Sequence, residues 1–241
     1  MSVQILPIAK SLIPNQRAEI RLMDNLMRRA NNAYPRISPY RIFTRTSNTS
    51  NEQPRYTLWL YNKLEQINDE RERWQGLPLI NFFSYMTTFV KYKKIGDCGE
   101  SSSIMMSSLL ANGYKDGRIA RLVFDAVIKD LKSGKIKEQK IIDTTHEFVV
   151  RNLAENADPT RTKTYGKNLI IIDAWEGFCG NLQEGFKRFY DSFMEGARYF
   201  VNEKTGTKII LKPRLYFCPK QTVTDADVAI FRSNFPELVM K

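Results

Sequence analysis

Three side chains in this sequence could together carry out nucleophilic chemistry: the thiol of Cys98, the imidazole of His146 and the carboxylate of Asp173. A thiol becomes a nucleophile when a neighbouring base takes its proton, and a third group orients that base. The chain contains a single histidine, so His146 is the one imidazole that could serve as the base. The order cysteine, histidine, aspartate therefore predicts a Cys–His–Asp triad.

The sequence around the cysteine, "GDCGESSSIMMSSLLANGY" (residues 96–114), predicts a helix that begins at Cys98 and ends at Gly113. Asp97 is a typical N-cap residue, and Glu100 stands three positions later, as in a capping box. A thiol in the first turn lies beside unpaired backbone N–H groups and the positive end of the helix dipole, which favour the thiolate. The Asp97 carboxylate opposes this effect unless the cap N–H groups neutralise it.

His146 and Asp173 lie in two segments that read as strands. Alternation places His146, Phe148 and Val150 on one face of "IIDTTHEFVVRNL" (141–153), and a lone histidine in that setting is more often a core residue than a catalyst. Asp173, however, interrupts the apolar run of "NLIIIDAWEG", and a buried carboxylate requires a partner. An imidazole N–H on a neighbouring strand would satisfy it and leave the other ring nitrogen facing the thiol.

Other residues of these types are assigned less specific roles. We expect Cys179 and Cys218 to be packing residues, and Asp143 and Glu176 to be alternative acids at strand ends and turns. The backbone N–H of Cys98 is a natural donor to an oxyanion, and a second donor should come from the preceding segment. Four residues remain open for that role: Tyr92, Asn81, Gln75 and Trp74.

The elements that must position these groups come in the order helices, then sheet, which predicts an α+β fold. We expect one catalytic domain over residues 1–241, with a helical portion (1–95), a cysteine-bearing helix plus antiparallel sheet (96–219) and a C-terminal helix (220–241). The pattern predicts helices at 16–33, 56–73, 78–94 and 181–200, strands at 118–128, 141–153, 168–177 and 207–219, and a short last helix capped by Thr224. The third strand, nearly all apolar, is expected to be central, and Pro213 predicts that the last strand is either bent or at an edge.

Composition excludes several classes of protein. The chain has 241 residues, 37 basic against 26 acidic side chains and a formal net charge of +11. The chain has three cysteines, an odd and low number for its length, so we expect no disulfide framework and infer a reducing compartment. With one histidine and no phosphate-binding or dinucleotide motif, we expect neither a metal nor a cofactor. No apolar run is long enough to span a membrane, and the N-terminus does not resemble a secretory signal. We therefore expect a soluble protein that is cytoplasmic or exported by a specialised system.

The basic charge bears on partners. No nucleic-acid motif is present, so we expect no nucleic-acid partner. A solvated basic surface is the simplest interpretation, and attraction to nucleic acid, to anionic lipid or to an acidic protein partner is the alternative. Arg28 and Arg29, on a predicted amphipathic helix, could instead touch an anionic membrane surface. The oligomeric state is not indicated.

The stretch 96–177 resembles the transglutaminase-like core of the papain-like cysteine enzymes. Four pieces carry the resemblance: "GDCGESSSIMMSSLLANGY", "RIARLVF", "HEFVV" and "LIIIDAWEG". The family often has His-Ala-Trp and Asp-Pro where this chain has His146-Glu147-Phe148 and Asp173-Ala174, which leaves the substrate class open. The second difference places Trp175 beside Asp173, where we expect it to shield the site and contact substrate.

The resemblance implies that Cys98 is the nucleophile, His146 the general base and acid, and Asp173 the group that orients the imidazole. It implies acyl transfer on protein amides through a thioester, in a transglutaminase, a deamidase or a protease. Small basic enzymes of this kind are typical of bacterial virulence effectors that act on host proteins. Two alternatives are a catalytically silent, basic protein-binding module of the same fold and an arylamine-type acetyltransferase, although the arginine-rich approach to the cysteine of the latter is missing.

Overall fold

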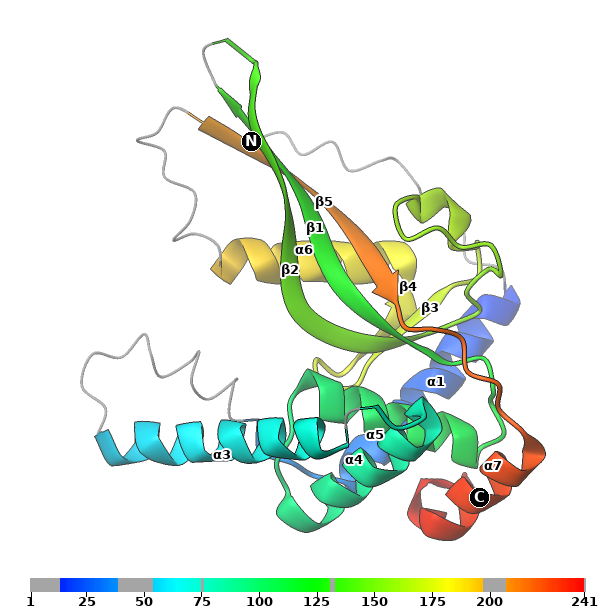
Figure 1. Ribbon diagram of the computed structural model, residues 1–241. Helices are drawn as coiled ribbons and strands as arrows, with labels where there is room; N and C mark the ends of the chain where they lie inside the picture. The colour runs from blue at the N-terminus through cyan, green and yellow to red at the C-terminus, as the bar shows by residue number, and fades with distance from the viewer. Residues whose placement is uncertain (1–13, 39–53, 75, 131–132, 197–206, 241) are drawn as a thin grey trace.

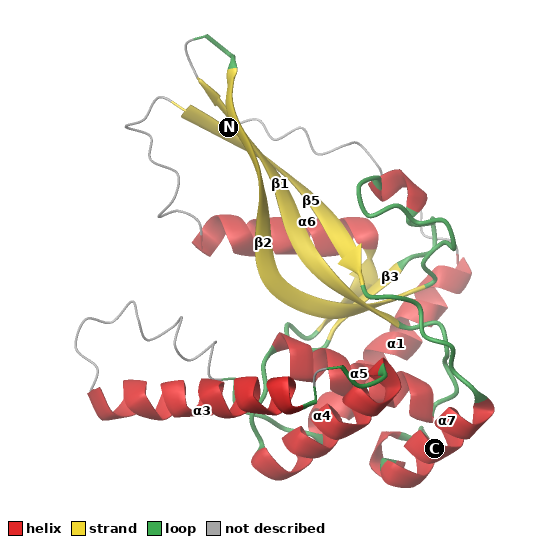
Figure 2. Cartoon of the chain, in the orientation of Figure 1, coloured by secondary structure: helices red, strands yellow, loops and turns green. Residues whose placement is uncertain are grey.

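The computed structural model describes residues 14–38, 54–74, 76–130, 133–196 and 207–240. Over these residues the protein is α+β, with most helices gathered in a layer beneath an antiparallel sheet and one helix on the opposite face (Figure 1, Figure 2). None of the described helices combines the length and the apolar character that crossing a membrane requires.

The helices and strands follow the predicted order. The helices are α1 (Pro14–Ala33), α3 (Pro54–Arg73), α4 (Leu79–Lys93), α5 (Cys98–Ala111), α6 (Leu182–Gly196) and α7 (Asp225–Asn234), with short 3-10 helices η1 (Thr162–Thr164) and η4 (Pro236–Leu238). The strands are β1 (Arg118–Asp130), β2 (Ile136–Arg151), β3 (Ile170–Asp173), β4 (Phe178–Asn181) and β5 (Thr207–Phe217). They form one sheet in the order β4-β3-β2-β1-β5, and every neighbouring pair is antiparallel.

Alternating side chains of the sheet enter two separate cores, one on each face. Val149 and Ile172 point towards the helical layer, where they join the larger core. Phe148, Val150 and Ile171 point the other way and pack with Phe189 and its neighbours on α6. The period-2 pattern of β2 and β3 therefore buries both faces, which accounts for the almost uninterrupted apolar run around residues 169–172.

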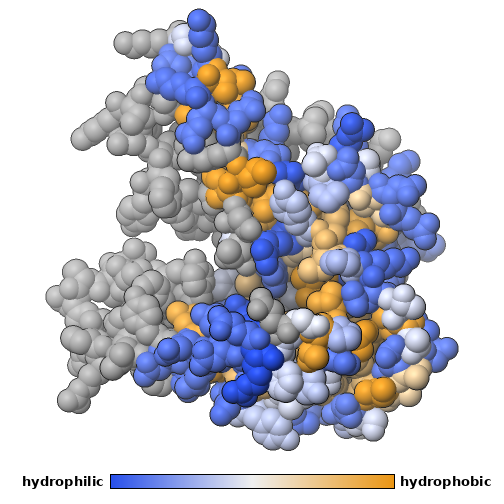
Figure 3. Space-filling view, viewed as in Figure 1, coloured by the Kyte–Doolittle hydropathy of each residue, from blue (hydrophilic) through white to orange (hydrophobic). Residues whose placement is uncertain are grey.

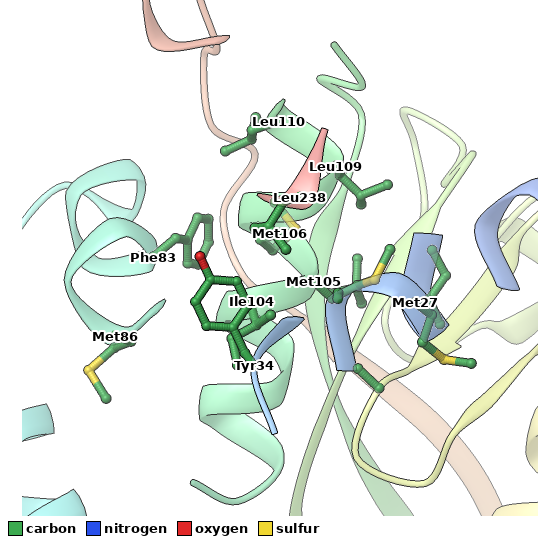
Figure 4. Close-up of a cluster of buried hydrophobic side chains, with 14 of the residues drawn as sticks. Met27, Tyr34, Phe83, Met86, Ile104, Met105, Met106, Leu109, Leu110 and Leu238 are labelled. Carbon is green, nitrogen blue, oxygen red and sulfur yellow. The ribbon is translucent and has the colours of Figure 1, made fainter. Parts of the chain in front are cut away.

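Helix α5 lies at the centre of the helical layer. Every residue from Gly99 to Ala111 is buried, as expected of a helix whose sequence is apolar or small on all sides. Side chains from α1, α4 and η4 surround it, including Met27, Phe83 and Leu238 (Figure 4). This burial fixes the direction of α5 and leaves only its first residue, Cys98, partly exposed.

The structure corrects two expectations about the sheet. The predicted strand 168–177 ends at Asp173, because the chain turns there: the Glu176 N–H donates to Asp173 Oδ1 at 3.0 Å, and Gly177 has a φ of 66°. The chain then returns as β4, which is too short for its sequence to show a period. Strand β3 is consequently second from one edge instead of central. The prediction that Pro213 lies in a bent or edge strand is confirmed within the described sheet, where β5 lies at an edge and pairs with β1.

The central position of α5 makes its apolar residues important for stability. Ile104 is fully buried in α5, whereas Ile230 of α7 is 53% exposed. We expect Ile104→Ala to lower the free energy of unfolding by about 2–5 kcal/mol because it leaves a cavity, and Ile230→Ala to change it by less than about 0.5 kcal/mol. Urea denaturation of both variants measures the difference, and equal losses would contradict the assigned core.

Candidate active site

The nucleophile candidate is the first residue of a well-capped helix. Asp97 and Glu100 form the predicted capping box, in which the Asp97 N–H donates to Glu100 Oε2 at 2.9 Å. The Asp97 carboxylate also accepts the hydroxyl of Ser38. The Ser38 hydroxyl therefore offsets part of the negative charge that Asp97 places beside Cys98.

His146 lies at an irregularity in β2. Arg121 of β1 pairs with Glu147, but the next described pair is Val123 with Asp143, so three residues of β2 face a single residue of β1. Thr144 stabilises this bulge by donating its hydroxyl to the Leu122 carbonyl at 2.7 Å. Bulges re-aim side chains, and this one lies where the imidazole turns towards α5.

Asp173 is fully buried and has a partner for each carboxylate oxygen. Oδ2 lies 2.7 Å from His146 Nε2, and Oδ1 accepts the Glu176 N–H. With Nε2 held by the carboxylate, Nδ1 is the ring nitrogen left for the Cys98 side chain, which hydrogen-bonds the imidazole. The structure thus brings together all three side chains predicted to form a triad, and their catalytic role stays a prediction.

The surroundings of the imidazole favour its charged form. Burial lowers the pKa of His146, but the charge of Asp173, the hydrogen bond that the imidazole donates to it and the contact with Cys98 outweigh burial, so the net effect raises the pKa above its usual value. The rings of Phe148, Trp175 and Phe189 enclose the imidazole at centroid distances of 5.7, 5.3 and 5.5 Å. In general, a protonated imidazole beside a cysteine sulfur stabilises the thiolate form, and the two then make a thiolate–imidazolium pair.

Cys98 and His146 line a cavity of about 830 Å³, a size typical of ligand sites, whereas the fully buried Asp173 lies behind His146 and is not part of the wall. It lies between the helical layer and the sheet, where apolar surface gathers in the space-filling view (Figure 3). Apolar side chains from α3, α4 and β1 form much of its wall, among them Leu64, Phe82, Ile119 and Leu122. Charged side chains of both signs complete it: Arg71, Arg121, Arg188, Glu100, Glu147 and Glu176. The cavity therefore suits a substrate with both an apolar and a polar part.

Of the four residues considered for the second oxyanion donor, two lie away from the cavity and a third has its N–H engaged. Tyr92, with 75% of its surface exposed, and Asn81, also exposed, do not line the cavity. Gln75 lies outside the described residues. Trp74 does line the cavity, but its indole N–H donates to Glu70 Oε1 at 2.6 Å and is already engaged.

Trp175 lies in the turn after β3 instead of continuing the strand, yet it reaches the expected place. Its ring packs on His146 and lines the cavity, and its Nε1 donates to Ser38 Oγ at 3.1 Å. This position agrees with the shielding role expected of it. Contact with substrate stays a prediction.

The remaining cysteines and acids differ in their relation to the site. Cys179 packs against the helical core, and burial raises its pKa to about 12. Cys218 packs there too but also lines the cavity, so it is not a packing residue alone; burial raises its pKa as well. The side chain of Asp143 lies outside the described residues. Glu176 lines the cavity, and its backbone N–H supports Asp173.

A segment that the sequence analysis did not single out holds the two halves of the site together. We call residues 34–38, which follow α1, the linking segment. Arg36 donates through Nε to Ser101 Oγ of α5 at 2.9 Å and through Nη2 to the Ala174 carbonyl at 3.3 Å. Ser38 is bonded both to Asp97 and to Trp175. The linking segment therefore joins the start of the cysteine helix to the turn that follows Asp173.

No local signal could have revealed this segment, because its partners are distant in sequence. Its backbone is fixed as well: Ile37 pairs with Ile95, accepting from the Gly96 N–H at 3.1 Å and donating to the Lys94 carbonyl at 2.9 Å. Arg71 of α3, which lies over the start of α5, was missed for the same reason. Among the described residues, no group of three His, Cys, Asp or Glu side chains is arranged to hold a metal ion.

Comparisons of the chain with models of protein families, with curated proteins and with solved structures gave no match.

The Asp173–His146 pair predicts a specific dependence of stability on pH. The pKa of His146 rises to about 10 in the folded protein, from about 6.5 for an unperturbed imidazole. Because the folded state holds this proton more tightly, its contribution to stability is complete below about pH 6.5 and is lost as the pH rises through about 10.

We expect Asp173→Asn to remove this contribution, so that its unfolding free energy falls less steeply than that of the wild type between about pH 6.5 and 10. Urea denaturation at several pH values tests this. Asp116→Asn is a matched control, because Asp116 pairs with Arg151, which does not titrate in that range. Parallel curves for the wild type and Asp173→Asn would contradict the assigned pair.

The bonds of the linking segment predict that a substitution in this segment slows the reaction of Cys98 by changing the geometry of the site. We expect Arg36→Gln to slow thioester formation from an activated ester by about 10²-fold, because the cysteine helix and the Asp173 turn lose their common support. Arg28→Gln is the control, since Arg28 is 70% exposed and pairs with Asp24. Unchanged rates in Arg36→Gln would remove the proposed support.

Proposed function

We propose that this protein is a transglutaminase-like cysteine enzyme that transfers acyl groups from protein amides through a thioester. Cys98 is the nucleophile, His146 the general base and acid, and Asp173 the residue that orients the imidazole. The observation that carries the proposal is the placement of His146, with Nε2 2.7 Å from Asp173 and the other ring nitrogen left for the Cys98 thiol at the cavity wall. This is the relation that nucleophile, base and orienting acid require.

The chemistry follows from that arrangement. In the reacting state the Cys98 proton resides on His146 as part of a thiolate–imidazolium pair, and the thiolate sulfur attacks the carbonyl carbon of an amide, forming a C–S bond and moving the carbonyl π electrons onto oxygen. The C=O bond then re-forms, the C–N bond breaks, and His146 delivers its proton to the leaving amine or ammonia. Water or an amine attacks the thioester next, which restores the thiol. Water gives a deamidase or protease, and an amine gives a transglutaminase.

The fold supports the same proposal. The nucleophile begins a buried helix packed against an antiparallel sheet, and the base and acid come from strands β2 and β3 of that sheet. This is the arrangement that the resemblance to the transglutaminase-like core implies. The mixed wall of the cavity suits a protein side chain that has an apolar stem and a carboxamide. The chain has 37 basic and 26 acidic residues, and this positive net charge would attract acidic proteins towards the enzyme. The acidic substrate could be a host protein.

Thiol labelling tests the proposed nucleophile. With iodoacetamide near neutral pH, we expect Cys98 to be alkylated much faster than Cys179 and Cys218, whose pKa values are raised by burial. His146→Ala should bring Cys98 down to the rate of an ordinary thiol. Cys179→Ser and Cys218→Ser serve as controls and should leave the fast phase in place. Labelling of Cys98 no faster than the other two would favour a catalytically silent binding module.

The reaction class requires a second measurement. We expect mass spectrometry of candidate acidic proteins, incubated with the enzyme and a primary amine, to show one of three products: an amine adduct, a deamidated side chain or a cleaved chain. Each product should disappear in Cys98→Ala. Acetyl transfer from acetyl-coenzyme A to an arylamine, without any of these products, would instead indicate the acetyltransferase alternative.

A further inference from the structure

Arg71 of α3 reaches across to the start of the cysteine helix. Its Nε donates to Glu100 Oε1 at 2.7 Å and its Nη2 to Glu100 Oε2 at 2.8 Å, a bidentate pair with a carboxylate that is 1% exposed. This pairing uses one edge of the guanidinium. Within the described part of the chain, Nη1 makes no hydrogen bond, and Arg71 lines the cavity together with Cys98.

Gly99 is what allows this approach. A Cβ on residue 99 would lie 2.9 Å from Arg71 Nη2 and 3.3 Å from Glu147 Oε2, so the guanidinium would have to shift away from its present position. The guanidinium therefore rests against the second residue of α5, directly after the nucleophile. The first backbone N–H groups of a helix lack partners within the helix, and Cys98, Gly99 and Arg71 all line the cavity.

The charges around Arg71 keep it cationic. Burial lowers its pKa, but Glu100, Cys98 and Glu147 outweigh burial, so its pKa is raised. Glu147 also faces this region and would repel an anion. Its carboxylate, however, is paired with Arg121 at 2.9 Å, which reduces that repulsion. An anionic atom bonded to Cys98 would thus meet a fixed cation on one side.

Acyl transfer requires such a cation or donor, because negative charge develops on the carbonyl oxygen when sulfur attacks. The Cys98 N–H can supply one hydrogen bond, and the sequence-based candidates for the second are exposed, already engaged or outside the described residues. We propose that Arg71 is the second oxyanion donor, a catalytic residue held in place by Glu100 and admitted by Gly99. This assignment rests on the proposed function of Cys98.

Two variants test the assignment without leaving a buried charge unpaired. Arg71→Gln combined with Glu100→Gln removes both charges and keeps an acceptor for the Asp97 N–H. Arg71→Lys keeps the charge and an ion pair with Glu100 but lacks the planar fork, and it decides the question if the neutral pair does not fold. Arg73→Gln is the matched control, since Arg73 is two residues away, 65% exposed and outside the cavity wall. Circular dichroism verifies folding.

Each variant is measured with two reagents. An activated ester acylates Cys98 through an oxyanion, whereas iodoacetamide alkylates it at a saturated carbon without one. We expect both Arg71 variants to lower kcat for the ester by about 10²–10³-fold with KM little changed, and to slow alkylation far less. Arg73→Gln should match the wild type with both reagents.

Other results would overturn the assignment. An unchanged kcat excludes Arg71 as a donor. A raised KM with kcat preserved makes Arg71 a site for a carboxylate on the substrate, and a parallel loss with both reagents means that it acts through the thiolate. Failure of the proposed function is a separate result, because the wild type would then show no fast alkylation or acylation of Cys98 and no dependence on His146.

Discussion

The site depends on one constraint, the need of a fully buried carboxylate for partners. Asp173 has no exposed surface, and an ionised group in that position is costly unless each oxygen is hydrogen-bonded. The His146 ring satisfies one oxygen and the Glu176 N–H the other. Because Nε2 is committed to this bond, the ring orientation and the nitrogen that faces Cys98 are both determined. The turn that ends β3 is part of the same solution, since it supplies the second donor.

The sheet and the helical layer must keep a fixed relative position if the His146–Asp173 hydrogen bond is to orient the imidazole towards Cys98. The sheet carries His146 and Asp173, while the helical layer carries Cys98. Packing between α5 and the sheet supplies the bulk of the contact, through a core that includes Val149 and Ile172. The linking segment adds directional bonds between the layers at the level of the site. Hydrophobic packing alone is non-directional, so the polar contacts of this segment fix the relative position of thiol and imidazole.

Charges of opposite sign alternate beside Cys98. Glu100 is paired with Arg71, and Glu147 with Arg121, so each of these two glutamates has its own guanidinium. The two ion pairs meet over Gly99, where a larger side chain would separate them. In a partly buried region these pairs avoid the cost of isolated charge. They also connect α3, α5, β1 and β2 at one point, so the electrostatics of the site and the positions of four elements depend on each other.

The sequence by itself determined the local features: the capped helix beginning at Cys98, the two-faced pattern of β2 and the improbable carboxylate at position 173. Each of these follows from interactions between residues a few positions apart, which leave a readable period or motif. Only the tertiary structure decided what depends on contacts between distant segments. These are the bulge that turns His146, the return of the chain as β4, the bonds of Arg36 and Ser38, and the approach of Arg71 to Gly99. None of these features leaves a periodic pattern in the sequence, because each depends on polar groups of separate elements that form hydrogen bonds or ion pairs only in the folded chain.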